Sequence, residues 1–285
     1  MLLGIRAIGK EPVRLDKGSA KVAATEVAKV KIFGERNTAT RAVITMLRMA
    51  EGVRPVSPKD PMPDLDELTA RIEATLTGFR KMVYRDTIRD IRDSRLGGIS
   101  SWKHAAPKID HSYATKGASV LFLVRDPYSW IASLYRNPYH ARAPEFESLE
   151  AFIRFPWITL ARDNVAPILP SPMDLWNTKL RTYREFARVA PVPSTIVQFE
   201  SFVLTPVVAL STALEALGIE AENLFEIEAS TKGLEEDRTA RQAYYREEAW
   251  KRQVSPQDAE LINGLVDWEV AESFGYHQRR PEEFS

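Results

Sequence analysis

The hydrophobic and polar positions of this chain follow two periods, which predict strands that alternate with helices. Three short apolar runs have the length of β-strands: Val30 to Phe33, Ala118 to Val124 and Thr195 to Phe199. The second run, ASVLFLV, is apolar at almost every position, as in a central parallel strand that is covered on both faces. We also expect a short strand from Ile99 to Lys103.

Apolar residues at steps of three and four predict helices between these strands. The helix after the first strand carries Val43, Met46 and Leu47 on its buried side. A long helix is expected to include the apolar face from Leu65 to Val83 and to end at Gly97-Gly98.

Three further helices have recognisable positions or ends. One directly follows the second strand. The next begins with Thr205 as its N-cap and stops at Gly218. The last opens with a capping box, Ser255-Pro256-Gln257-Asp258, and ends near Gly275.

Strands that alternate with helices predict an α/β fold with a doubly wound, mainly parallel central sheet and flanking helices. Residues 137–180 interrupt this alternation because they are rich in proline and aromatic residues. We expect them to form a helical insertion that could act as a substrate lid. No internal repeat or low-complexity tract divides the chain, so a single domain over residues 1–285 is expected.

The amino-acid composition excludes several classes of protein and of site. The 285 residues include 39 basic and 39 acidic side chains, and this zero net charge argues against a protein that coats nucleic acid. The absence of cysteine excludes disulfide frameworks, thiolate nucleophiles and cysteine-based metal sites. No segment has the length of a membrane span, and the first 16 residues lack the apolar core of a signal peptide. We therefore expect a cytoplasmic protein with no membrane span.

The segment from Gly34 to Thr40 joins the first strand to its helix and has the features of an anion-binding loop. Backbone N–H groups and the positive end of the helix dipole point toward such a turn. Arg36 adds a full positive charge, and Thr38 adds a hydroxyl donor, as does Thr40. This pattern favours a loop that binds nucleotide phosphates, although an ordinary strand-to-helix turn remains an alternative.

The loop does not match the Walker A pattern of kinases and NTPases. That pattern requires Gly, four residues, and then Gly-Lys-Ser/Thr. Counted from Gly34, the second glycine position holds Ala39 and the lysine position holds Thr40. A nucleotide or small-molecule kinase with a degenerate loop stays open as a second hypothesis.

The loop resembles that of sulfotransferases that use 3′-phosphoadenylyl sulfate (PAPS), in which the pattern reads Pro-Lys-Ser-Gly-Thr-Thr-Trp. Glu35 to Arg41 align with these seven positions, and Thr40 is identical. Arg36 then stands at the lysine, and Arg41 stands at the tryptophan that stacks on adenine. The resemblance implies that the donor is contacted by Arg36, Asn37, Thr38, Ala39, Thr40 and Arg41. It also implies a catalytic role for Arg36, which would stabilise the charge that builds on the leaving phosphate oxygen.

A second segment, Arg125 to Tyr135, is similar to the part of the same family that binds the donor's 3′-phosphate. In that family an arginine at a strand end and a serine eight residues later hold the phosphate together. Arg125 and Ser133 have this spacing, and the two motifs occur in the family's order along the chain. The fork of donors on a guanidinium suits a phosphate. The alternative is that Arg125 pairs structurally with Asp126 or a helix end and that Ser133 is a buried helix serine.

The resemblance also indicates a catalytic base. Cytosolic sulfotransferases carry a histidine just before a proline, and it takes the proton of the acceptor hydroxyl. Here His104 lies in the sequence KHAAP, one residue further from Pro107 than in that pattern. This departure leaves open whether the base is His104, Lys103 or a carboxylate elsewhere; the chemistry of a histidine is suitable.

Near the C-terminus, residues 239–254 are candidates for the family's basic segment that closes over the donor, with Arg246 as the residue we select. The Arg-Lys-Gly signature of that segment is absent, and Lys232-Gly233 is an alternative counterpart.

Together these resemblances imply transfer of a sulfuryl group from PAPS, as co-substrate, to a hydroxyl or amine, without a metal ion. A non-catalytic nucleotide-binding relative is a third hypothesis. The implied fold is P-loop NTPase-like. The acceptor could be a small molecule, a glycan or a lipid, and Tyr139, Trp157 and Trp176 of the insertion would suit stacking on a ring. The oligomeric state is not set by the sequence.

Overall fold

A four-stranded parallel sheet forms the centre of the molecule. The computed structural model describes residues 27–56, 63–138, 145–227 and 238–284. The strands are β1 (Ala28–Gly34), β2 (Val53–Pro55), β3 (Ala118–Val124) and β6 (Ser194–Gln198). They lie in the order β2-β1-β3-β6, and each neighbouring pair is parallel. The three strands expected from the apolar runs are confirmed, whereas the three-residue β2 was not expected.

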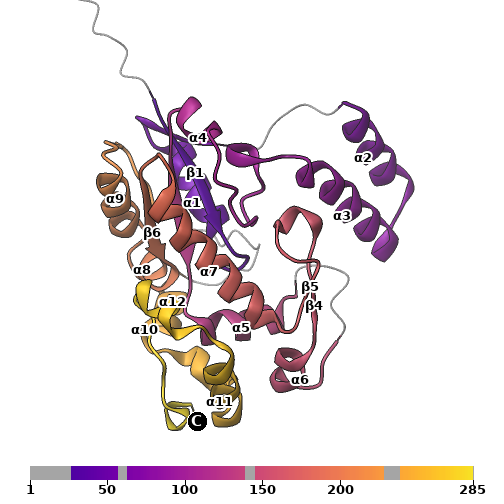
Figure 1. The fold of residues 1–285 in the computed structure, drawn as a ribbon, viewed down its shortest axis with the longest axis vertical. Coiled ribbons are helices and arrows are strands. Elements are labelled where there is room, and N and C mark those ends of the chain that lie inside the picture. The colour runs from indigo at the N-terminus through magenta and orange to yellow at the C-terminus, as the bar shows by residue number, and fades with distance from the viewer. Residues whose placement is uncertain (1–26, 57–62, 139–144, 228–237, 285) are drawn as a thin grey trace, which may run out of the picture.

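Helices cover both faces of this sheet (Figure 1). Side chains of β3 alternate between the faces: Val120 and Phe122 enter one core layer, and Leu121 and Leu123 enter the other. The smaller layer is completed by α1 (Thr40–Met49) and α9 (Pro206–Ala216). The larger is completed by α5 (Pro127–Arg136), α7 (Pro172–Val189), α11 (Pro256–Leu265) and α12 (Trp268–Ser273). The predicted α/β class, with a parallel sheet between helices, is confirmed.

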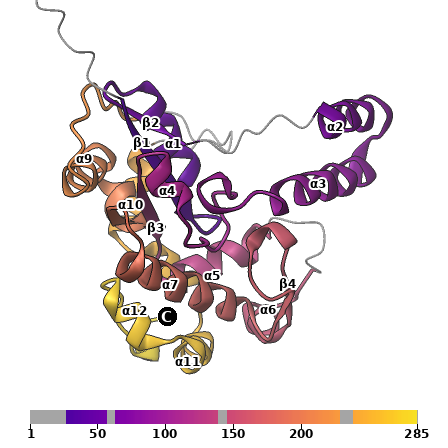
Figure 2. The ribbon, with the colours of Figure 1, turned by 45° about the horizontal axis from the view of Figure 1, so that its top comes forward.

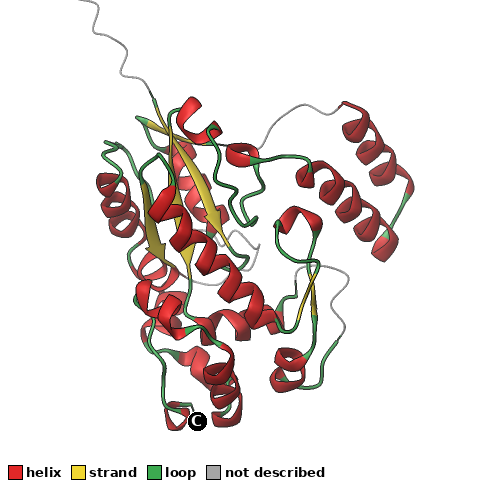
Figure 3. Cartoon of the chain, in the orientation of Figure 1, coloured by secondary structure: helices red, strands yellow, loops and turns green. Residues whose placement is uncertain are grey.

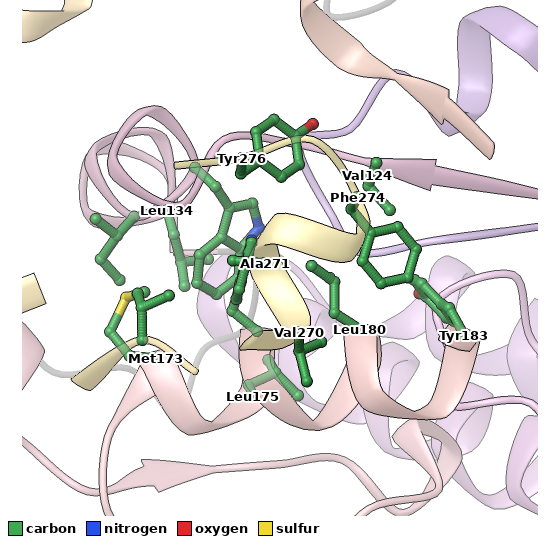
Figure 4. Packing of buried hydrophobic residues seen from close by; sticks show 14 of the residues in the cluster. Val124, Leu134, Met173, Leu175, Leu180, Tyr183, Val270, Ala271, Phe274 and Tyr276 are labelled. Atoms are coloured by element: carbon green, nitrogen blue, oxygen red, sulfur yellow. The ribbon is translucent and has the colours of Figure 1, made fainter. Parts of the chain in front are cut away.

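The larger layer is packed from aromatic and branched side chains. Figure 4 shows Leu180 of α7 beside Val270 of α12, with Phe274 close to Tyr183. The ring of Tyr183 also stacks on Phe122 of β3, with 4.6 Å between centroids. Each such side chain contributes about 1.5–3 kcal/mol by leaving water, so this layer fixes α7 firmly against the sheet.

The prediction of a strand from Ile99 to Lys103 is wrong. The chain instead forms a short 3-10 helix, η1 (Gly98–Ser100), followed by a turn. Two serine hydroxyls bind the backbone here, because Ser101 Oγ donates to Gly98 O and Ser112 Oγ accepts from Ile99 N. Such local bonds compete with a strand ladder.

The long helix expected from Leu65 to Val83 is two helices, α2 (Pro63–Thr75) and α3 (Gly78–Ser94). Thr77 is extended and Gly78 has φ of 56°, which turns the chain back on itself. The pair projects away from the sheet in both Figure 1 and Figure 2, and α3 packs on the 3-10 helix η2 (Ala161–Asp163).

The insertion expected as helical also contains strands. It has α6 (Leu149–Arg154) and the start of α7, but β4 (Trp157–Ile158) and β5 (Ile168–Leu169) pair antiparallel between them. Figure 3 shows this strand pair apart from the central sheet. Trp157 and Trp176 are buried in the core, so neither is free to stack on an acceptor; Tyr139 lies outside the described residues.

Two predicted helix ends have different outcomes. Thr205 is the N-cap residue of α9, as predicted, but its side chain makes no cap hydrogen bond, because the hydroxyl donates to Ser201 O of the preceding helix. The capping box of α11 between Ser255 and Asp258 is confirmed, but a separate α12 follows and ends just before Gly275. The remaining elements are α4 (Ser112–Thr115), α8 (Phe199–Leu204), α10 (Arg238–Arg246), η3 (Ala249–Gln253) and η4 (Pro281–Glu283). Within the described ranges, no helix combines the length and the apolar character needed to cross a membrane.

Candidate functional site

The strand order places the topological switch point, where open α/β sheets form a ligand crevice, between the carboxyl ends of β1 and β3. The chain passes from β1 to β2 on one side and then crosses back to β3 on the other, so the connections diverge between β1 and β3. The 34–40 loop follows β1, and Arg125 follows β3. Arg125 Nη1 donates to the carbonyl oxygen of Asn37 at 2.7 Å, so the two segments singled out in the sequence are in direct contact.

Close packing at Gly34 shapes the start of the loop. A Cβ atom there would lie 2.8 Å from Leu123 Cβ and 2.8 Å from Thr38 Oγ1, well inside normal contact distances. The N–H of Gly34 donates to the carbonyl of Lys103 at 3.0 Å. Only glycine therefore lets β1, β3 and the following turn approach this closely.

The loop itself holds an unusual backbone. Asn37 and Ala39 both have left-handed conformations, with φ of 66° and 62°, and such residues cost of order 1 kcal/mol or more each. The hydroxyl of Thr38 donates to Glu35 O at 2.5 Å, which closes the turn. In the described part of the chain, the backbone N–H groups of Thr38, Ala39 and Thr40 donate no hydrogen bond. A buried helix start with unused N–H groups is suited to an anion.

Arg125 is buried, at 2% exposure, and all its hydrogen-bond partners are neutral. Nε donates to Ser129 Oγ at 2.9 Å, and Nη2 donates to the hydroxyl of Tyr245 at 3.3 Å. The guanidinium carbon lies 4.2 Å from the ring centroid of Phe199. Among the described residues, no carboxylate oxygen lies within 4.0 Å of its nitrogens. Burying an unpaired cation costs several kcal/mol, which a bound anion would offset.

Two carboxylates, Asp126 after β3 and Glu200 after β6, are engaged elsewhere. Asp126 caps α5 by accepting from Ser129 N at 2.9 Å, and its other oxygen lies 3.8 Å from Arg279. Burial, with the nearby Glu200 carboxylate, raises the pKa of Asp126 to about 7. Glu200 accepts from Asp126 N and from the hydroxyl of Tyr276, both at 3.0 Å. The predicted alternative of an ion pair between Arg125 and Asp126 is therefore not observed.

Two neighbours of the residues expected to bind the 3′-phosphate contact Arg125. Ser129, one turn into α5, accepts a hydrogen bond from Arg125, and the expected Ser133 is buried one turn further along the helix. Arg246 is exposed at the end of α10, and the preceding Tyr245 makes the contact with Arg125. Sequence reasoning missed Ser129 and Tyr245; the arginine-to-serine spacing of one helical turn could have indicated the first.

Arg36 does not present a free charge to the crevice. Its Nη1 lies 3.4 Å from Asp163 Oδ1 and 3.5 Å from Glu35 Oε1. The guanidinium also stacks on the indole of Trp102, with 4.3 Å to the ring centroid. Its backbone carbonyl accepts from Trp130 Nε1 at 3.1 Å. These contacts fix the loop, and two carboxylates already balance the side-chain charge.

Lys179 of α7 completes the buried network beneath the loop. Its Nζ donates to the carbonyl oxygens of His104 at 2.5 Å and Asp163 at 3.1 Å, and lies 3.7 Å from Glu35 Oε2. Burial lowers the pKa of Lys179 and raises that of Glu35, while each charge favours ionisation of the other. With Arg36, two cations face two carboxylates. The network is balanced and joins the loop, the insertion and α7.

His104 lies against the loop as a neutral imidazole. Its Nδ1 is 2.6 Å from the carbonyl oxygen of Gly34. Because a carbonyl can only accept, Nδ1 carries the proton and Nε2 keeps its lone pair. Burial, followed by the charges of Arg36 and Lys103, lowers the pKa of His104 well below its usual value. This tautomer can accept a proton at Nε2.

Lys103 lies against the start of the loop, where its carbonyl accepts from Gly34 N, and Arg41 follows the loop in the chain. Burial and then the charges of Arg41, Arg36 and Arg48 lower the pKa of Lys103 to about 8. Arg41 is exposed in the first turn of α1. Within the described residues, no three side chains of His, Cys, Asp or Glu are grouped so that they could hold a metal ion.

The fold and the site define an α/β protein in which a loop with unused backbone N–H groups meets a buried arginine at the carboxyl ends of the central strands. No protein-family model matches the chain, and no curated protein matches it.

Proposed function

We propose that this chain is a PAPS-dependent sulfotransferase with a P-loop NTPase-like fold, which transfers a sulfuryl group from PAPS to a hydroxyl or amine. The observation that carries the proposal is the buried guanidinium of Arg125, which has no carboxylate within 4.0 Å among the described residues and touches the 34–40 loop at Asn37. Two anion-binding features side by side fit a ligand that carries phosphate at two positions.

The chain's own groups suit the two ends of such a ligand. Three of the five N–H donors of Arg125 are used, which leaves two for the 3′-phosphate. The unused N–H groups of Thr38, Ala39 and Thr40 would hold the 5′-phosphate and sulfuryl oxygens and stabilise charge that builds on the leaving phosphate. The bound donor supplies the sulfuryl group.

His104 is the base in this scheme, because Nε2 of its neutral ring can take the proton of the acceptor. Arg36, which sequence analysis placed at the leaving oxygen, already has two carboxylate partners. We therefore assign its side chain to holding the loop and leave the charge of the transition state to the backbone N–H groups.

Calorimetry with 3′-phosphoadenosine 5′-phosphate tests the proposal. We expect the wild type to bind, and Arg125→Ala to bind about 10–100-fold more weakly, since hydrogen bonds to a charged group contribute roughly 1.5–3 kcal/mol. Arg188→Ala is the matched control because Arg188 is exposed on the far part of α7 and pairs only with its neighbour Glu185 in the described structure. Its affinity should equal that of the wild type.

Absence of binding by the wild type, or undiminished binding by Arg125→Ala, would contradict the proposal. Binding of ATP with magnesium in place of the 3′-phosphorylated nucleotide would favour the kinase hypothesis. Binding of the nucleotide without transfer to any acceptor in a screen with labelled donor would favour the non-catalytic relative.

A further inference from the structure

Helix α10 brings an aromatic side chain onto the cation of the crevice. The hydroxyl of Tyr245 lies 3.3 Å from Arg125 Nη2, and the ring centroid of Tyr245 lies 5.5 Å from the guanidinium carbon. The same ring meets Phe199 edge to face, with 5.0 Å between centroids. Gln242 of α10 also donates to Leu204 O at the end of α8, at 3.0 Å. The position of Tyr245 over Arg125 is therefore supported by several contacts.

We propose that Tyr245 binds the phosphomonoester held by Arg125 and makes the site specific for a phosphate on the ribose rather than for the nucleotide as such. This inference rests on the proposed function, because it assigns a further residue to the donor's 3′-phosphate.

The hydrogen-bond inventory of Tyr245 leads to this role. Its hydroxyl oxygen accepts from Arg125, so its own O–H is left to donate, and it donates to no acceptor in the described part of the chain. A phosphomonoester presents three acceptor oxygens. The two unused N–H donors of Arg125 and the O–H of Tyr245 together match that number.

The rings of Phe199 and Tyr245 also affect the strength of the hydrogen bonds that these donors can form. Phe199 covers the guanidinium at 4.2 Å and is itself buried, and Tyr245 closes the neighbouring side. Excluding water lowers the local dielectric, and each charge-assisted hydrogen bond becomes stronger. An anion at this position thus meets a cation that water competes for only weakly.

Tyr244 offers a matched comparison on the same helix. Its hydroxyl accepts from Gln253 Nε2 at 2.6 Å, and its ring lies against that of Tyr245 at 5.1 Å. It makes no hydrogen bond with Arg125 in the described structure. Tyr244→Phe removes a hydroxyl from the same helix, as Tyr245→Phe does, but it leaves the hydrogen-bond donors at Arg125 unchanged.

The experiment is calorimetry with two nucleotides, 3′-phosphoadenosine 5′-phosphate and adenosine 5′-phosphate, which lacks the 3′-phosphate. We expect Tyr245→Phe to weaken binding of the first about tenfold, the effect of losing one hydrogen bond to a charged group, and to leave the second unchanged. Tyr244→Phe should leave both affinities unchanged. Thermal unfolding of each variant verifies that the fold is retained.

Each possible failure has a distinct meaning. If the wild type does not bind the 3′-phosphorylated nucleotide, both the proposed function and this inference are overturned. If the wild type binds and Tyr245→Phe binds equally well, Tyr245 is not a ligand and only the inference fails. Equal weakening of both nucleotides by Tyr245→Phe would show that the residue merely supports the crevice, and this also overturns the inference.

Discussion

Lys31 and Arg125 are both buried cations that have no carboxylate partner within the described residues, yet their chemistry differs. Nζ of Lys31 donates to Ser101 O, and burial lowers the pKa of Lys31 to about 7, so this side chain can become neutral. A guanidinium cannot lose its proton in a protein. Arg125 therefore keeps a full charge in a site that leaves two of its donors unused, and this difference is why we assign the ligand to Arg125.

His104 allows the roles of its two ring nitrogens to be separated. An asparagine at this position can still donate from its side-chain amide to Gly34 O, as Nδ1 does, but it offers no basic nitrogen in place of Nε2. We expect His104→Asn to bind 3′-phosphoadenosine 5′-phosphate like the wild type and to transfer the sulfuryl group about 10²–10⁴-fold more slowly. Calorimetry and a labelled-donor assay measure the two quantities.

The matched variant in that assay is Lys103→Met, because Lys103 was the alternative base. It should retain most of the transfer rate if His104 takes the proton. Rapid transfer by His104→Asn together with a large loss in Lys103→Met would reverse the assignment.

At the scale of the elements, side chains of α5 and α7 bind backbone carbonyl groups in the three segments of the site, those of Arg36, Arg125 and His104. Trp130 of α5 donates to Arg36 O at 3.1 Å, and Trp176 of α7 donates to Arg125 O at 3.0 Å. Lys179 of α7 donates to His104 O at 2.5 Å. Each bond fixes a backbone position next to a candidate site residue. Side-chain donors on rigid helices thus preorganise the crevice before any ligand binds.

The approach of β1 to β3 at Gly34 gives a direct test of that preorganisation. Gly34→Ala places a Cβ 2.8 Å from the Cβ of Leu123 on β3 and from Thr38 Oγ1, so the loop must move. We expect the free energy of unfolding to fall by about 1–3 kcal/mol, as for overpacking, and the affinity for 3′-phosphoadenosine 5′-phosphate to fall with it. Urea unfolding and calorimetry measure both effects.

Gly97→Ala is the control for this change. Gly97 has φ of −123°, and an added Cβ there meets no atom within 4 Å. Its stability and nucleotide affinity should match those of the wild type. An unchanged affinity in a folded Gly34→Ala protein would show that the loop position does not control binding.

Across the whole molecule, the parts predicted correctly from the sequence are those encoded by local periodicity. The run from Ala118 to Val124 coincides with β3 because both faces of that strand are covered, and parallel topology then brings Arg125 to the 34–40 loop. The sequence pattern did not predict that α2 and α3 are two separate helices. The apolar period continues through Gly78, which reverses the direction of the chain.

Residues that reach the site from distant parts of the chain could not be found in the same way. Asp163 and Lys179 meet the loop only because the insertion and α7 fold back over it. Tyr245 is 120 positions from Arg125 and belongs to no periodic pattern that would indicate the contact. Their placement follows from tertiary packing. The local sequence pattern is compatible with several such packings, so it does not select one of them.

The buried Lys31 makes the stability of the whole protein depend on pH in a defined direction. Its pKa is about 7 in the folded chain and near 10.5 in the unfolded chain. Between these values the unfolded state binds more protons, so the Lys31 contribution to stability rises with pH, by at most about 1.4 kcal/mol per pH unit. The energetic penalty of burying the Lys31 charge is fully present below pH 7.

We expect Lys31→Met to be more stable than the wild type at pH 7 and to lose much of that gain at pH 9.5. Urea unfolding at the two pH values measures the difference. A constant difference between Lys31→Met and the wild type would mean that Lys31 stays protonated in the folded protein, and the contrast with Arg125 would then no longer support the choice of ligand site.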